Sequence, residues 1–413
     1  MLFRSRPNFR SSSSSRWTSS AFSSAATCSL KKSRVTSSVD NVLTGRSYRP
    51  VVRFLLATAG LLLLVGSAVA GRPTVHTLRK SANGPIVAVA QNNNVAAWLT
   101  YTSATTGPCN VVHILSPGKH DRSLPQPSSG TMTCNWTLTD GQPQLAFAAH
   151  MSTALWTLHE SGPQPLDWVM AASIGGPERE LKRLAHASDG TGRWLGGVAG
   201  AGKTLAYSWD DVEYVNPTDC LSGGSCKQKI ADGGIQIVTR NSDTPLPGAE
   251  PALQLAAAAG RIAYIPATTV RSGRPTVTTN NELPIVDATT GELLDQVFVH
   301  GIPIAIALSA KVLAVLTTQG TIHDRISWFS TADGTKLGNV LVSPDTVPQL
   351  AASDRLIVYR VGNLLRDVST RTGRVGKLVK TGINYVGLSL AGGRLIWAEN
   401  HNRTGRLRAL TVG

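Results

Sequence analysis

The chain has 413 residues, 42% of them hydrophobic and 16% charged, which suffices for a sizeable core in one large repeat fold or in two or three average domains. Its 39 glycines and 22 prolines indicate many turns and favour an all-β protein over a helical one. The net charge of +15 does not indicate nucleic-acid binding, because residues 1–70 hold ten basic residues and one acid, and the remaining basic residues are scattered.

Residues 1–45 form a basic leader that is rich in serine, with five in a row at Ser11–Ser15 and a single acid, Asp40. This composition predicts a disordered segment. Two other interpretations remain open. The leader could be an upstream extension from a wrongly assigned start codon, or an organellar transit peptide, although the export signal that follows argues against transit to an organelle.

Residues 46–70 have the three parts of a secretory signal peptide. Three arginines precede the thirteen uncharged residues of Phe54–Gly66, and a small-x-small end, Ser67–Ala70, completes the signal. The apolar stretch is shorter than the roughly 20 residues that a membrane span needs. We expect cleavage after this segment and a secreted or extracytoplasmic domain over residues 71–413. The alternative is an uncleaved anchor formed by the hydrophobic helix of residues 54–70, the only part expected to enter a membrane.

Four cysteines follow the leader, and an even number predicts disulfides in an oxidising compartment. The closest pairing joins Cys109 to Cys134 and Cys220 to Cys226. Four cysteines allow three connectivities, so the pairing stays open. Neither pair has the C-x-x-C spacing of a zinc or redox site, so we expect no metal bound by cysteine.

Seven segments share one pattern. Each begins with a short apolar strand, continues through a turn of small residues, and finishes with a second apolar strand whose last residue is aromatic or valine. They are Val87–Trp98, Leu145–Trp156, Gly196–Tyr207, Leu253–Tyr264, Ile304–Val315, Val347–Val358 and Val386–Trp397. Six align without a gap, with an apolar third residue and a small fourth residue; the segment at Val347 is shifted by one. The segments recur about every 50 residues, which leaves room for four strands and predicts a seven-bladed β-propeller.

The pattern also places the strands within each blade. Small residues suit inner strands that converge on a crowded central channel, and large apolar residues on the next strand would fill the space between blades. Three further turns, Asp287–Gly291, Ser330–Gly334 and Ser369–Gly373, are predicted to join the third and outer strands. The last unit lacks an outer strand. We expect Thr74–Leu78 to supply it beside Leu407–Val412, which closes the ring and leaves no edge unpaired.

With these segments and turns, residues 71–413 resemble the TolB-like and WD-like β-propeller superfamily of exported bacterial proteins. The sequence lacks the Gly-His to Trp-Asp signature of the standard WD repeat, a recurring kelch double-glycine signature and the Trp-docking motifs of quinoprotein propellers. The resemblance therefore implies a propeller fold and no particular activity.

One segment, Gly197–Thr204, formally matches the phosphate-binding P-loop pattern G-x-x-x-x-G-K-[ST]. A P-loop requires a helix after the glycines, because the helix N-terminus and the loop amides hold the phosphates. Here Leu205 and the residues after it align with a repeat strand instead. We therefore predict a blade turn at this position and no nucleotide cofactor.

No other motif predicts catalysis. Ser389 lies in Gly-Leu-Ser-Leu-Ala, which lacks the final glycine of a nucleophile elbow. His120–Asp121 and His323–Asp324 are adjacent pairs, and neighbouring strand residues point to opposite faces. Asp210, Asp211 and Glu213 are expected in a solvated loop, with a calcium site as the alternative. We therefore predict no catalytic, cofactor-binding or metal-binding residue.

These observations favour a non-enzymatic, monomeric binding platform for a protein or carbohydrate partner. The aromatic residues that end the repeats (Trp98, Trp156, Tyr207, Tyr264 and Trp397) could form a ligand-stacking ring, but their fixed register with apolar positions favours core packing. The loops of residues 102–134 and 211–226 are the predicted recognition elements. Two alternatives are a hydrolase or lyase acting on an extracytoplasmic polymer, which needs titratable groups at the channel, and a membrane-anchored sensor.

Overall fold

The computed structural model describes residues 74–412 except 82–83, 102–109, 125–142, 161–163, 219–225, 279–280, 319, 321, 346, 383 and 403. The leader and the export segment therefore lie outside the described residues, and their assignment stays a prediction. In the part of the chain that is described, no helix is both long enough and apolar enough to cross a membrane.

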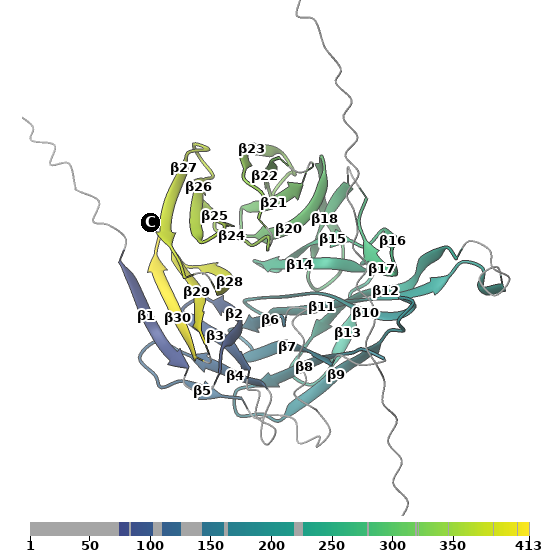
Figure 1. Ribbon diagram of the computed structural model, residues 1–413, viewed down its shortest axis with the longest axis horizontal. Helices are drawn as coiled ribbons and strands as arrows, with labels where there is room; N and C mark the ends of the chain where they lie inside the picture. Colours follow the sequence, from purple (N-terminus) through teal and green to yellow (C-terminus); the bar gives the residue numbers. More distant parts are fainter. Residues whose placement is uncertain are drawn as a thin grey trace, which may run out of the picture. The chain divides into compact units, whose positions relative to one another are not determined.

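The described chain forms seven four-stranded antiparallel sheets around a central opening (Figure 1). We call these sheets blades 1 to 7 in chain order. Blade 1 contains β2 (Ile86–Asn92), β3 (Val95–Tyr101), β4 (Asn110–Leu115) and β5 (Arg122–Ser123). Blade 2 contains β6 (Leu145–Ala148), β7 (Thr153–Glu160), β8 (Leu166–Ser173) and β9 (Glu178–Ala185). Blade 3 contains β10 (Gly192–Ala201), β11 (Thr204–Tyr214), β12 (Gln228–Val238) and β13 (Asp243–Pro245).

Blade 4 is interrupted by a small hairpin, β16 (Thr269–Arg271) and β17 (Arg274–Thr276). Its four strands are β14 (Ala252–Ala258), β15 (Arg261–Pro266), β18 (Asn281–Asp287) and β19 (Leu293–Val299). Blade 5 contains β20 (Ile302–Leu308), β21 (Val312–Thr318), β22 (Asp324–Ser330) and β23 (Lys336–Val342). Blade 6 contains β24 (Leu350–Ala352), β25 (Leu356–Val361), β26 (Leu364–Ser369) and β27 (Val375–Lys380). Blade 7 contains β28 (Tyr385–Ala391), β29 (Arg394–His401), β30 (Thr404–Thr411) and β1 (Val75–Ser81).

The ring is closed by the two ends of the propeller chain. Strand β1 is the outer strand of blade 7 and pairs with β30 from Val75 opposite Leu410 to Ser81 opposite Gly405. The inner strands also form a complete circle, since β28 contacts β2 as well as β24. The predicted seven-bladed propeller and its closure by an N-terminal strand are therefore confirmed.

Each repeat contributes to two interfaces between blades, as its residue pattern predicts. In the six repeats that align without a gap, the terminal residue packs against the preceding blade, as Trp98 packs with Ile396 of blade 7 and Tyr207 with Leu155 of blade 2. The small fourth residue faces the following blade, where Ala199 lies among blade 4 side chains. All five aromatic residues that end repeats are at most 3% exposed, which confirms that they belong to the core.

The one shifted repeat also fits. In blade 6, Leu350 is opposite Tyr359, which matches the pairing of Val89 with Trp98 in blade 1 after a displacement of one residue. Tyr359 is 3% exposed and packs against blade 5, so it is the buried aromatic residue of that repeat.

The three predicted outer turns connect the third and fourth strands of blades 4, 5 and 6. In each turn the glycine amide donates to the carbonyl four residues earlier, as Gly334 does to Ser330 at 3.1 Å. The φ of Gly334 is +62°, a left-handed conformation that costs a residue with a Cβ about 1–2 kcal/mol. Glycine is therefore required at this position for the turn to close.

Candidate binding site at the central channel

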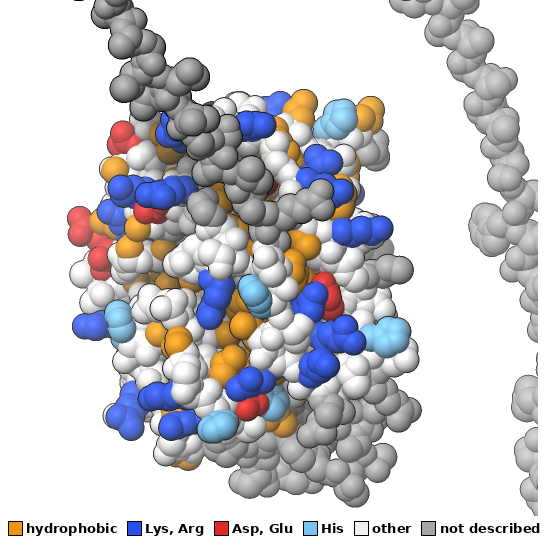
Figure 2. Space-filling view, turned by 90° about the vertical axis from the view of Figure 1, so that its left-hand side faces the viewer, with side chains coloured by type: hydrophobic (Ala, Val, Ile, Leu, Met, Phe, Trp, Pro, Cys, Tyr) orange, Lys and Arg blue, Asp and Glu red, His pale blue; other side chains and the backbone are white. Residues whose placement is uncertain are grey.

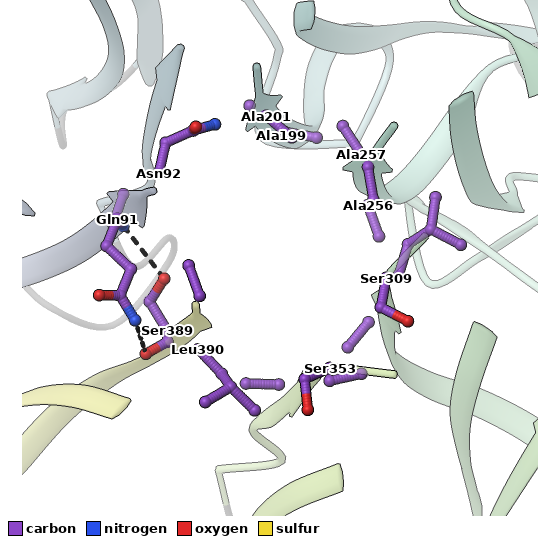
Figure 3. Close-up of a pocket in the computed structure, with 18 of the residues that line it drawn as sticks. Gln91, Asn92, Ala199, Ala201, Ala256, Ala257, Ser309, Ser353, Ser389 and Leu390 are labelled. Atoms are coloured by element: carbon purple, nitrogen blue, oxygen red, sulfur yellow. Dashed lines mark hydrogen bonds between the residues drawn. The ribbon is translucent and has the colours of Figure 1, made fainter. Parts of the chain in front are cut away.

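A cavity of about 870 Å³ occupies the centre of the ring and is lined by the inner strands of all seven blades. It opens among the turns that join the first and second strands, such as Gly202 in blade 3 and Gly392 in blade 7. Figure 3 shows Ala199, Ala256 and Ser309 around the opening. Small side chains at the fourth repeat position keep this space empty, because larger ones would meet across the converging strands.

The wall is mostly apolar. Among the described residues that line the cavity, only Asp354 and Arg355 carry charges, and no histidine, cysteine or glutamate is present. The Asp354 Oδ1 atom accepts a hydrogen bond at 2.9 Å from the backbone amide of Lys311 in blade 5, so this carboxylate holds two blades together. Asp354 is thus the one carboxylate among the described lining residues, and the Lys311 amide already binds it.

Most polar side chains at the cavity make hydrogen bonds within the wall. Ser309 and Ser353 each accept a hydrogen bond from a backbone amide three residues later, which closes their hairpin turns. The Asn92 amide is at the edge of the opening in Figure 3 and donates to the Phe147 carbonyl of blade 2 at 3.4 Å, a long and weak bond. Asn92 is buried, whereas the adjacent Asn93, also in the lining, is exposed and is the more accessible polar side chain.

Gln91 is among the lining residues and joins the first blade to the last. Its side-chain amide donates to the backbone carbonyls of Ser389, at 2.6 Å, and Arg394, while its backbone amide donates to the Ser389 hydroxyl at 3.0 Å. Arg394 donates back to the Gln91 Oε1 atom at 3.2 Å. Burial lowers the pKa of the Arg394 guanidinium, since its charge is partly removed from water.

Two other glutamines, one just before an inner strand and one within an inner strand, make similar bridges, and the repeat pattern did not predict them. Gln144 of blade 2 donates to the Gly196 carbonyl at 2.9 Å and accepts from the Val198 amide at 3.0 Å, both in blade 3. Gln254 of blade 4 donates to the Ile304 carbonyl of blade 5 at 2.8 Å. A glutamine amide on an otherwise apolar strand is the one sequence signal that could have pointed to these bridges.

The formal P-loop match lies in a hairpin turn. Strand β10 ends at Ala201, and strand β11 begins at Thr204. Lys203 is exposed at the tip of the turn. A strand follows the glycines, as the repeat alignment predicted, and the helix N-terminus of a P-loop does not form here.

The structure does not assemble the remaining candidate residues into one site. His323 is exposed while Asp324 is buried, which agrees with the expectation that the pair diverges. Of the four cysteines, three lie outside the described residues and Cys226 is exposed, so the predicted disulfides stay a prediction. Asp121 forms an ion pair with Arg79 at 3.7 Å.

The acidic residues of β11 are on a strand, which corrects the predicted solvated loop. Asp210 is 1% exposed, and burial raises the pKa of its carboxyl to about 7. Asp211 pairs with Arg193 at 3.5 Å, and Glu213 is exposed. Because successive strand residues point to opposite faces, Asp210 and Asp211 diverge. Across the described residues, no cluster of three or more His, Cys, Asp or Glu side chains could hold a metal ion.

On the face shown in Figure 2, Lys and Arg side chains are spaced apart by apolar and uncharged ones. The two loops predicted as recognition elements lie partly outside the described residues, at 102–109, 125–142 and 219–225. Strands β3 and β11 end at Tyr101 and Tyr214, shortly before residues 102–109 and 219–225. These described strand ends and the turns around the cavity, which join the first and second strands, therefore lie at opposite ends of the strands.

No family model and no curated protein matches the sequence. Among solved structures, an acylaminoacyl peptidase from Pyrococcus horikoshii matches with a TM-score of 0.48 and 9% identity over 80% of this chain and 52% of that one. The Dos1 propeller matches with a TM-score of 0.42 and 8% identity over 81% and 95%. An uncharacterized protein from Listeria monocytogenes matches with a TM-score of 0.42 and 8% identity over 78% and 92%. The seven-bladed β-propeller assignment therefore rests on the strand order of the chain itself.

Proposed function

We propose that the protein is an exported, non-enzymatic binding module that holds a ligand or a partner segment at the mouth of its central channel. One observation carries the proposal: a cavity of about 870 Å³ is lined by all seven blades with mainly small and apolar residues. A concave, largely apolar site with a few polar groups is typical of a binding site. The near absence of titratable side chains in the lining favours binding over hydrolysis.

The export part of the proposal rests on the sequence of residues 46–70. Expression of the full chain in a bacterial host should yield a mature protein that begins at Gly71 in the extracytoplasmic fraction. N-terminal sequencing of that protein measures this directly. Intact Met1 in the membrane fraction would instead support the anchored sensor, and a protein retained in the cytoplasm would contradict export.

The binding part can be tested by filling the channel. A partner is first identified by cross-linking to the exported protein, and its affinity is then measured with purified variants. Ala201→Trp and Ala257→Trp each place an indole at the cavity lining. We expect each to weaken binding at least tenfold while the denaturation midpoint stays within a few degrees.

The control variant is Ala332→Trp, an exposed position in the outer turn of blade 5 that should leave binding unchanged. A second control replaces residues 102–109, which follow the end of β3 at Tyr101, with a short turn. If the loop replacement abolishes binding and the two channel variants do not, the proposed site is wrong and the long loops carry the function.

A further inference from the structure

A second groove lies on the outside of the ring, between blades 3 and 4. The outer strand of blade 3, β13, is only three residues long, whereas β19 of blade 4 has seven. Beyond β13, the segment that joins the two blades runs beside blade 4 and contributes Gly248 and Glu250 to the lining of the groove. A groove of about 500 Å³ remains there, with Tyr264, Pro284 and Phe298 among its lining residues.

Two prolines help to open this groove. Strands β15 and β18 pair from Arg261 opposite Asp287 to Ala263 opposite Ile285, and the pairing ends there. Continued pairing would place Pro284 and Pro266 in the ladder, and proline has no amide hydrogen to donate. The two strands separate beyond this point, and the chain between them forms the inserted hairpin β16–β17.

The side chains in the groove follow the alternation of the strands. Glu282, Pro284 and Val286 lie two residues apart on β18, as do Gln296 and Phe298 on β19, and all five line the groove. Phe298 is 49% exposed and the neighbouring Leu293 is 54% exposed, both high values for large apolar side chains. Such an exposed apolar surface beside polar residues is typical of an interaction site.

The charge of the groove is opposite to that of the chain as a whole. Its described lining contains two carboxylates, Glu250 and Glu282, and neither lysine nor arginine, although the chain carries a net charge of +15. Both glutamates are exposed, and the Glu282 Oε2 atom accepts a hydrogen bond from Gln296 at 2.7 Å, which holds the carboxylate at the groove wall. A ligand that fits must therefore bring positive charge together with apolar side chains.

We propose that this groove binds an extended peptide of a partner protein in which leucine-like residues and lysine or arginine recur at every second position, so that both kinds of side chain lie on the face turned to the groove. Its apolar residues would cover Pro284, Leu293 and Phe298, and its basic residues would pair with Glu250 and Glu282. Extended segments commonly bind beside exposed strands in this way, with alternate side chains entering pockets. The groove is separate from the channel mouth, so the proposal does not depend on the function proposed above.

The test uses full-length protein and the fluorescein-labelled peptide Gly-Lys-Ser-Leu-Ser-Leu-Ser-Lys-Gly, whose lysines and leucines share one face when it is extended, and follows binding by fluorescence anisotropy. We expect binding that weakens about tenfold when the peptide lysines are replaced by glutamate, and about tenfold when its leucines are replaced by serine. The double variant Glu250→Gln/Glu282→Gln should remove most of the preference for lysine, and Phe298→Ser should remove most of the preference for leucine.

Matched controls separate the groove from general surface effects. Glu292→Gln removes an exposed acid of blade 4 outside the groove, and Leu341→Ser removes an exposed apolar side chain of blade 5. Neither should change the affinity. Equal affinity for the lysine and glutamate peptides, or no binding at about 1 mM peptide, would overturn the proposal. So would a homodimer that dissociates on Phe298→Ser, because the occupant would then be a second copy of the chain.

Discussion

The Gln91 side-chain amide on β2 donates to the Ser389 carbonyl on β28 at 2.6 Å, although the two residues are 298 positions apart in the sequence. This contact joins the first blade to the last, beside the strand pairing that closes blade 7. The ring is thus held at its closing junction both by side chains near the channel and by β1 at the rim.

Gln91→Ala should destabilise the propeller by about 1–3 kcal/mol, because it leaves the partly buried Arg394 guanidinium and two backbone carbonyls without this partner. Gln254→Ala removes a single bridging hydrogen bond and should cost less. Urea denaturation of the two variants measures both values. An equal loss of unfolding free energy in the two variants would mean that the Gln91 contacts contribute no more to stability than the Gln254 contact between blades 4 and 5.

The rim closure can be weakened without breaking the strand. Val75 and Leu78 of β1 pack against the apolar clusters on either side of β30, so the double variant Val75→Ser/Leu78→Ser should lose on the order of 2 kcal/mol. It should also self-associate, since a detached β1 leaves the β30 edge open. His76→Ser/Lys80→Ser changes exposed positions of the same strand and serves as the control. Light scattering and denaturation check both effects, and a stable monomeric double variant would contradict the closure argument.

The buried carboxyl of Asp210 predicts a pH dependence of stability. Its pKa is raised from 3.8 to about 7 in the folded protein, so between about pH 4 and pH 7 the unfolded chain ionises while the folded chain keeps its proton. The free energy of unfolding should therefore fall as pH rises through this window. Asp210→Asn should reduce that fall and stabilise the protein at pH 8 by an amount on the order of a few kcal/mol. A part of the fall should remain, because burial also raises the pKa of the Glu178 carboxyl to about 8.

The measurement for Asp210 is the denaturation midpoint at several values of pH for the wild type, Asp210→Asn and Asp211→Asn. Asp211 is the matched control, because it lies next in the strand and pairs with Arg193. A wild type and an Asp210→Asn variant with parallel pH profiles would show that Asp210 ionises normally in the folded protein.

Gly338 on β23 leaves room for the Trp328 indole. A Cβ at this position would lie 2.3 Å from the indole Cζ2 atom, so Gly338→Ala should destabilise the protein by about 1–3 kcal/mol. Trp328 is fixed in place because its Nε1 atom donates to the Thr370 carbonyl of blade 6 at 3.0 Å.

A double-mutant cycle of Gly338→Ala with Trp328→Phe tests this contact, since the smaller phenyl ring should relieve most of the clash with the added methyl group. We expect Gly338→Ala to cost much less in the Trp328→Phe protein than in the wild type. Additive free energies of unfolding would show that the glycine is needed for another reason.

Much of the fold could be predicted because each repeat carries its own local pattern. The apolar third residue and small fourth residue alternate on one strand, so Val198 and Ala199 face opposite neighbours wherever that strand lies in a ring. The turn at Ser330–Gly334 was predicted for the same local reason. The glutamine bridges were not predicted, because the partner of Gln91 depends on which blades become neighbours after closure.

The sequence by itself determined the number of blades, their inner hairpins and the strand that closes the ring, because these follow from alternation and turn chemistry within short segments. Only the tertiary structure decided where space remains. The central cavity arises where seven strands with small side chains converge, and the groove at Phe298 arises because β13 is short while two prolines end a ladder in the next blade. The cavity and the groove both depend on how closely neighbouring sheets pack. A short sequence segment does not determine this, because the packing partner lies elsewhere in the chain.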